Sequence, residues 1–240
     1  SEEISVTVMA KKDGKWISYK PFSIFISEDE IDPWVSYRLI PPGYQGWRHM
    51  GIYQRCLENF TQKTILDNSS SDNNCMNCHS YPSRNPHKML FHARAEHGGT
   101  FLIQDGTIEK LNTKTDSTIS ALVYPYWHPE GRFIMYSTNT TQQVFHVQDA
   151  NRIEVFDQAS DLLLYDTEAN ELVQNPLLAR DSVMETFPAF SADGKTLYYS
   201  QATALPEGSR ELQNLHYNLC RIDFDAATWF KDCYGIVKDE

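Results

Sequence analysis

Long apolar runs and targeting signals are missing from this chain of 240 residues. The best apolar stretch, Leu162-Leu163-Leu164-Tyr165, falls far short of the roughly 20 residues that span a bilayer. The first residues, Ser1-Glu2-Glu3, lack the basic and then apolar pattern of a signal peptide. We therefore expect no transmembrane segment in the chain. An export signal or a lipid anchor would have stood upstream of Ser1.

Catalytic motifs and positive charge are also scarce. The sequence has no Gly-x-Ser-x-Gly, no glycine-rich phosphate loop and no His-Glu-x-x-His, so no motif supports a hydrolase or a kinase. Its 21 Lys and Arg residues stand against 32 Asp and Glu, and the net charge of −11 argues against nucleic acid or an anionic membrane as a partner. The 41% of hydrophobic residues suffices for a folded core.

Cysteine is rare, and two of the five cysteines stand in one short motif. The segment 75–79, Cys-Met-Asn-Cys-His, has the form of the attachment signal for c-type haem. Cys75 and Cys78, on one side of a helical turn, would form thioethers to the two vinyl groups of a porphyrin, and His79 would be the proximal iron ligand. The other cysteines, Cys56, Cys220 and Cys233, define no disulfide framework. The motif thus predicts haem c as the cofactor.

Two other chemistries use the same residues. A Cys-x-x-Cys pair can act as a redox dithiol, and two cysteines can form half of a zinc site. Zinc needs two more ligands at short spacing, and the chain has no second Cys-x-x-Cys. Haem attachment is therefore the preferred interpretation, followed by the dithiol and then by zinc.

Three segments repeat around an aromatic-Pro pair, at 81–82, 124–125 and 187–188. Each has the pattern strand, tight turn, strand, and the turn residues Gly131 and Gly194 suit positive φ. Further strands are expected at 100–104, 107–111, 161–166, 171–174 and 219–224, and upstream at 34–40, 51–57 and 63–67. Four strands per unit at a period of about 45 to 60 residues predict an all-β fold with about four blades of a β-propeller.

The hairpins YPYWHPEGRFIMYS and FPAFSADGKTLYYS resemble the TolB-type propeller repeat. Together with DPWVSYRLIPPGY, MGIYQR, CMNCHS, MLFHAR, HGGT and NLCRIDFD, they resemble a family of TolB-like envelope proteins of Bacteroidetes that carry one c-type haem motif in a blade. The resemblance covers residues 32–230 and implies a partial propeller with haem c at 75–79. The motif blade departs from its siblings, because residues 85–88, Asn-Pro-His-Lys, lack the turn glycine.

Residues 1–31 do not fit the repeat. Short strands expected at 4–9, 16–19 and 22–26, around the Asp13-Gly14 turn, look like the last strands of a small β-sandwich. We therefore expect two parts, the end of a sandwich-like domain at 1–31 and a propeller portion at 32–240. Further blades, from residues outside this chain or from another chain, would close the ring.

Strand order predicts that the motif lies just before the innermost strand of its blade, on the propeller face with the long loops at 41–50, 95–99, 139–160 and 203–214. Aromatic side chains on those loops would cover the porphyrin or pack against their own loops. They are Tyr44, Trp47, Phe145 and Phe156. Arg94, at a strand end near the motif, is a candidate partner of a haem propionate, although exposure to solvent is commoner for such an arginine.

The distal iron ligand has several candidates. His97, beside two glycines, comes first, and Met50 or His49 comes second. His92 would lie on a strand next to the motif, and strands about 4.8 Å apart are too close for two imidazoles to sandwich a porphyrin. A vacant or water-bound position is the remaining alternative. A histidine pair would lower the redox potential, a methionine would raise it, and an open position would bind a small gas.

Other side chains are interpreted as structural. Met89 aligns with apolar residues of the sibling blades and is expected in the core. His128 stands in a turn, where it would form hydrogen bonds to the turn backbone. Asp149, Asp157 and Asp161 match no calcium loop, so a solvated acidic face is expected there.

These features predict an exported haem protein, periplasmic or at the cell surface, that passes single electrons to a protein partner in the cell envelope. Such a protein is more an electron carrier than an enzyme that turns over a substrate. One alternative is a TolB-like interaction scaffold in which the haem is a structural staple or a sensor. Another is a haem enzyme acting on peroxide or a small molecule, which needs an open sixth position on the iron.

Overall fold

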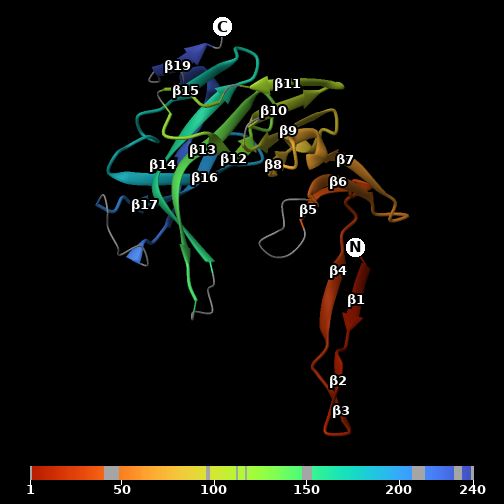
Figure 1. Ribbon diagram of the computed structural model, residues 1–240. Helices are drawn as coiled ribbons and strands as arrows, with labels where there is room; N and C mark the ends of the chain where they lie inside the picture. The colour runs from red at the N-terminus through yellow and green to blue at the C-terminus, as the bar shows by residue number, and fades with distance from the viewer. Residues whose placement is uncertain are drawn as a thin grey trace. The chain divides into compact units, whose positions relative to one another are not determined.

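The computed structural model describes residues 2–40, 49–95, 98–111, 113–116, 118–147, 153–206, 214–229 and 234–238, which fold almost entirely as antiparallel β-sheet (Figure 1). The predicted all-β fold is confirmed. Trp47, Tyr44 and His97 lie outside the described residues. No described helix is long and apolar enough to cross a membrane. The chain divides into two compact units, residues 1–37 with 53–65 and residues 38–52 with 66–240.

The N-terminal strands of the first unit form two small ladders. β1 (Glu2–Val6) pairs with β4 (Phe22–Ile26), and β2 (Met9–Lys12) pairs with β3 (Lys15–Ser18). Asp13 and Gly14 join β2 to β3 with φ of 49° and 78°, as the predicted two-residue turn requires. The strand predicted at 22–26 is confirmed and the one at 16–19 agrees with β3 to within one residue, whereas the single strand predicted at 4–9 is divided between β1 and β2. Among the described residues, 2–26 pair only with one another and are mostly exposed.

A three-stranded sheet follows, with β5 (Trp34–Leu39), β6 (Gly51–Cys56) and β7 (Gln62–Asp67) in that order. These are the strands expected of an upstream blade. The division into two units runs through this sheet, whereas the sequence placed a domain boundary at 31–32. A 3-10 turn, Asn68–Ser71, then leads toward the motif, and Asp67 caps it by accepting a hydrogen bond from the Ser69 amide at 3.0 Å.

Three further sheets of the second unit follow one another along the chain. The motif blade contains β8 (Met76–Ser80), β9 (Lys88–Ala93), β10 (Gly99–Gln104) and β11 (Thr107–Leu111). The second blade contains β12 (Leu122–Trp127), β13 (Phe133–Phe145), β14 (Ile153–Asp166) and β15 (Glu171–Gln174), with β19 (Tyr234–Lys238) at its outer edge. The third blade contains β16 (Val183–Phe190), β17 (Thr196–Thr203) and β18 (Asn218–Asp223), followed by helix α1 (Ala226–Trp229). The first strands β8, β12 and β16 contact one another in that order, which makes them the inner strands.

The second blade carries a long two-stranded arm where the sequence predicted a loop. The ladder between β13 and β14 runs without interruption from Phe133 opposite Asp166 to Phe145 opposite Ile153, with one register shift (Figure 1). Threonine recurs along β13, and valine, isoleucine and phenylalanine occur in both segments; these residues favour strands. The predicted loop at 139–160 is therefore wrong. Phe145, a predicted cover for the porphyrin, lies near the end of this arm and is 62% exposed.

The core lies on both faces of the second blade, because side chains alternate across a strand. Met135 and Leu164, directly opposite each other, pack with residues of the third blade such as Leu197. The next pair, Tyr136 and Leu163, packs with the motif blade. The residues of the two clusters that lie outside the second blade are Phe190, Leu197, Tyr199, Phe224 and Trp229 on one side and Leu90, Leu102 and Leu111 on the other.

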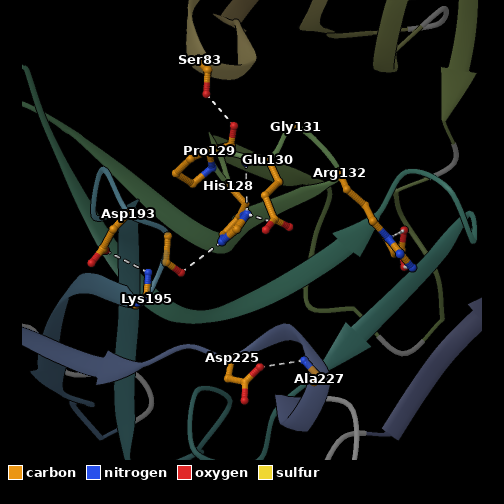
Figure 2. A network of polar contacts seen from close by, with 12 residues as sticks. Ser83, His128, Pro129, Glu130, Gly131, Arg132, Asp193, Lys195, Asp225 and Ala227 are labelled. Carbon is orange, nitrogen blue, oxygen red and sulfur yellow. Dashed lines mark hydrogen bonds and ion pairs between the residues drawn. The ribbon is translucent and has the colours of Figure 1, made fainter.

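The turns of neighbouring blades are linked through His128 (Figure 2). Its Nε2 lies 3.0 Å from the Gly194 carbonyl oxygen, and its Nδ1 accepts from the Glu130 amide at 3.3 Å. The hydroxyl of Ser83 donates to the Pro129 carbonyl at 2.6 Å, which links the motif blade to the second blade. The structural role predicted for His128 is confirmed. Its side chain holds two turns together.

The predicted turn glycines have the expected backbone. Gly131 and Gly194 have φ of 76° and 70°. The turn of the motif blade, which lacks this glycine, instead has Ser83 and Arg84 in left-handed conformations, with φ of 44° and 62°. The motif blade thus reverses its chain direction with two residues in a left-handed conformation. This conformation costs free energy for any residue other than glycine.

We expect Gly194→Ala to destabilise the protein far more than Gly106→Ala. Both glycines have positive φ, so alanine costs about 1 to 2 kcal/mol at either site. Only at Gly194 would the new Cβ lie 2.3 Å from a side-chain atom, the Nε2 of His128, whereas nothing lies within 4 Å at Gly106. Urea unfolding should show an additional loss of about 1 to 3 kcal/mol for Gly194→Ala. Equal losses would contradict the packing of His128 on this turn.

Candidate functional site

The Cys-x-x-Cys-His motif lies in an extended segment rather than on the predicted helical turn. Residues 76–80 form β8, and Cys75 directly precedes it. The Cys75 carbonyl accepts a hydrogen bond from the Arg94 amide at 2.9 Å, which continues the pairing of β8 with β9. The motif is therefore part of the inner strand, and the prediction that it precedes that strand is wrong.

A β-bulge interrupts β8 inside the motif. Asn77 lies opposite His92 and Ser80 lies opposite Leu90, so two residues of β8 face a single residue of β9. Cys78 has φ of 56°, in the left-handed region that residues other than glycine rarely adopt. The bulge brings Cys78 and His79 out of the regular alternation of the strand.

The same bulge occurs in the first strand of each of the three blades. The left-handed residues are Cys78, Tyr124 and Phe187, with φ of 56°, 50° and 53°. The residue that directly precedes Cys78 lies opposite His92. The residues that precede Tyr124 and Phe187 lie opposite Ser137 and Ser200 in the same way. Cys78-His79 therefore stands where the siblings have the pairs Tyr124-Pro125 and Phe187-Pro188.

This register corrects the alignment made from the sequence. Tyr81-Pro82 is the only aromatic-Pro pair of the motif blade, but it lies three residues beyond the equivalent position. Between Asn77 and His92 the motif blade has one residue more than the other two blades have between the equivalent positions. Matching the aromatic-Pro pairs by residue type therefore aligns the wrong residues of the first strand. His92 lies at the position that Ser137 and Ser200 have in the other two blades.

The three bulge residues form a row along the inner strands. Cys78 accepts a hydrogen bond from the backbone amide of Tyr124, and the Tyr124 ring lies 4.7 Å from the Phe187 ring. The carboxylate of Asp157, itself bound to the Tyr217 hydroxyl at 2.7 Å, raises the pKa of Tyr124, although burial is the main cause. The row places the motif against the inner edge of the next blade.

The two thiols are free and partly exposed. Burial raises the pKa of the Cys78 thiol, and the Tyr124 amide and the guanidinium groups of Arg94 and Arg38 offset only part of this effect. Cys78 is therefore held in its protonated form. Because a catalytic dithiol or a zinc site needs a thiolate, this environment disfavours both alternatives. An uncharged thioether has no such penalty.

The other predicted ligands have distinct surroundings. His79 is partly exposed, and its ring lies edge-on to Tyr81 at 6.4 Å. Met50 is 1% exposed, and its sulfur accepts a hydrogen bond from the Met76 amide at 3.2 Å, so it is a core side chain that supports the motif. His49 is exposed. Met89 is buried, as predicted.

A cavity of about 700 Å³ lies at the end of β9, the strand that pairs with β8. Arg94 and His92, on the strand paired with β8, contribute to its wall. Two lysines, Lys110 and Lys114, bring further positive charge, and the remaining lining residues are Ala93, Ala95, Gly98, Gly99, Leu111, Thr113, Ser120, Ala121, Val123, Asn139 and Thr141. A cavity with three cationic side chains suits an anionic group such as a carboxylate.

The donor set fits covalently attached haem. Cys75, Cys78 and His79 are all partly exposed, and the guanidinium groups of Arg94 and Arg38 act electrostatically on Cys78. Arg94, predicted to meet a propionate, is exposed and lines the cavity. The predicted acidic face, in contrast, is not simply solvated. Asp161 is partly buried, and burial together with the Asp181 carboxylate raises its pKa to about 6.

We expect His92 to make the protein less stable below neutral pH. Burial, with a smaller contribution from Arg94, lowers the pKa of His92 from 6.5 to about 4, so the unfolded chain binds a proton between these values and the folded chain does not. The free energy of unfolding should therefore fall with falling pH, by about 1.4 kcal/mol per unit from this residue. The substitution His92→Ser introduces the serine that the other two blades have at this position. It should remove the contribution of His92 to the pH dependence of the free energy of unfolding. A pH-independent offset between the two proteins would contradict the assignment.

Comparison with known proteins finds similarity in solved structures only. No protein family and no curated protein matches the chain. Dipeptidyl peptidase 4 of Porphyromonas gingivalis is 11% identical over 65% of this chain and 25% of its own, with a TM-score of 0.41. An oligogalacturonate lyase in complex with manganese is 14% identical over 71% of this chain and 41% of its own, with a TM-score of 0.38. Pyrococcus horikoshii acylaminoacyl peptidase is 14% identical over 81% of this chain and 31% of its own, with a TM-score of 0.42. The chain spans less than half the length of each, and such distant likeness assigns it no activity.

Proposed function

We propose that this chain is an exported c-type haem protein of the TolB-like propeller type, which passes single electrons to a protein partner in the cell envelope. The observation that carries the proposal is the position of Cys78-His79. The pair replaces the aromatic-Pro pair at the bulge of an inner strand, and Cys75 and Cys78 are both free and partly exposed.

Cys75 and Cys78 would hold the porphyrin through thioethers, and His79 would bind the iron. When bound, the haem supplies reversible one-electron chemistry. The surroundings of Cys78 suit the uncharged thioether, since burial disfavours the thiolate. The bulge gives Cys78 and His79 a backbone direction that regular strand pairing would not allow. The buried Met50 sulfur accepts a hydrogen bond from the Met76 amide, and this bond stabilises the start of β8.

The carboxylates of the porphyrin would meet positive charge. Arg94 and Arg38 act electrostatically on Cys78, and Arg94 belongs to the wall of the cavity together with Lys110 and Lys114. Guanidinium groups bind carboxylates in a bidentate manner, which fixes orientation as well as position. The distal ligand stays open in this proposal. Its candidates are His97, which lies outside the described residues, and the exposed His49.

The proposal is tested by expressing the chain behind an export signal in a bacterium that matures c-type cytochromes. The purified protein should carry one covalently bound haem per chain, measured as the pyridine haemochrome after acid-acetone extraction has removed loosely bound haem. Cys75→Ala and Cys78→Ala together should abolish the signal, because both thioethers are lost. Cys56→Ala with Cys220→Ala, matched in number and type, should leave it unchanged.

Electron transfer is tested on the same preparation. Dithionite should reduce the haem and ferricyanide should reoxidise it over repeated cycles without loss of absorbance. A reduced spectrum that carbon monoxide does not alter supports the carrier function, whereas a strong response favours an enzyme with an open sixth position. Wild-type protein without haem, from cells that mature a control cytochrome, would refute the proposal.

A further inference from the structure

Two aromatic rings continue from the haem motif along the inner strands. Cys78, Tyr124 and Phe187 occupy the same bulge position in successive blades. Cys78 accepts a hydrogen bond from the Tyr124 amide, and the rings of Tyr124 and Phe187 lie 4.7 Å apart at an interplanar angle of 51°. The motif blade has a thiol where the other two blades have a ring. The row of rings therefore ends at a sulfur to which the haem would be attached.

The two rings present apolar surface that the described part of the chain leaves uncovered. Tyr124 is 40% exposed and Phe187 is 49% exposed. Tyr217, whose hydroxyl interacts electrostatically with that of Tyr124, is 38% exposed. Exposed apolar side chains that gather in one patch mark binding surfaces more often than scattered ones do. This patch begins directly beside Cys78.

Hydrogen bonds fix the surroundings of the rings. Asn139 donates to the Thr186 hydroxyl at 3.1 Å and to the Asp157 carboxylate at 3.0 Å. Thr186 directly precedes Phe187 and is completely buried. Asp157 also accepts from the Tyr217 hydroxyl at 2.7 Å. The residues around the rings are thus linked before any ligand binds, and a surface that is already ordered binds at a lower entropic cost.

Arg94 brings positive charge to the same place. Burial raises the pKa of the Cys78 thiol and of the Tyr124 hydroxyl, and the Arg94 guanidinium opposes this rise in each group. One cation therefore lies near both the sulfur and the first ring of the row. A macrocycle that is apolar on its faces and carries carboxylates would find both kinds of partner beside Cys78.

We propose that Tyr124 and Phe187 form an apolar platform that covers one face of the haem attached to Cys78. This inference rests on the proposed function, because it needs the covalently bound haem. The faces of a porphyrin are flat and apolar, so they gain from packing against aromatic rings. By keeping water from the haem, the platform raises the redox potential, since water favours the more highly charged ferric form. The covers predicted from the sequence include neither ring; they are Tyr44, Trp47, Phe145 and Phe156.

The test uses the exported, matured protein with Tyr124→Ala, and Phe101→Ala is the matched control. Phe101 also contacts a second aromatic ring, that of Phe91 at 5.1 Å, but it lies on β10, which β9 separates from the inner strand. The pyridine haemochrome should report one covalent haem per chain in both variants, because neither change removes a thioether. At a fixed solution potential, the ratio of reduced to oxidised haem should fall at least threefold in Tyr124→Ala and stay at the wild-type value in Phe101→Ala.

Thermal unfolding separates a cover of the haem from packing within the protein. Tyr124→Ala should lower the melting temperature of the haem-loaded protein at least twice as much as that of the haem-free protein with Cys75→Ala and Cys78→Ala. Phe101→Ala should lower both melting temperatures by the same amount. Tyr124→Phe, which keeps the ring, should behave as the wild type in both measurements.

The outcomes distinguish this inference from the proposed function. Wild-type protein without covalent haem refutes both. One haem per chain with an unchanged ratio of reduced to oxidised haem in Tyr124→Ala overturns the platform alone. Equal losses of melting temperature with and without haem in Tyr124→Ala also overturn the platform alone, because the ring then packs only against protein.

Discussion

The structure depends on the apolar residues that face both sides of the second blade. Leu162, Leu163 and Leu164 follow one another in β14, and their side chains alternate between the third blade and the motif blade. β13 supplies the matching residues directly opposite. Burial of an aliphatic side chain contributes on the order of 1.5 to 3 kcal/mol, so these strands dominate the packing of both neighbours. The inner strands β8, β12 and β16 are brought side by side as a consequence.

The candidate site follows from that arrangement. Because the inner strands carry the same bulge, the position of Cys78 is set by a backbone feature that Tyr124 and Phe187 share. Each blade of the repeat thus has a β-bulge in its inner strand, at which regular strand pairing is interrupted. In the motif blade this place holds a thiol and an imidazole instead of an aromatic ring and a proline. Burial keeps Cys78 uncharged, and Arg38 and Arg94 bring positive charge to it. Two thiols near one another, an accessible imidazole and nearby cations are what a covalently bound, carboxylate-bearing macrocycle needs.

Much of the fold was predictable from the sequence, because strand patterns and turn glycines are local signals. The strands of the three blades, the Asp13-Gly14 turn and the structural role of His128 are all confirmed. The sequence predicts a loop at 139–160, because asparagine and glutamine interrupt the apolar pattern there, whereas the structure has a two-stranded arm. The match of Tyr81-Pro82 to the aromatic-Pro pairs of the other blades was wrong by three residues, because the equivalent pair, Cys78-His79, shares neither residue type with them.

The most direct test of the central claim is peptide mass spectrometry of the exported, matured protein. The account predicts one haem on the peptide that contains residues 75–79, with both of its cysteines modified. Two unmodified cysteines in that peptide, from cells that mature a control cytochrome, would contradict it.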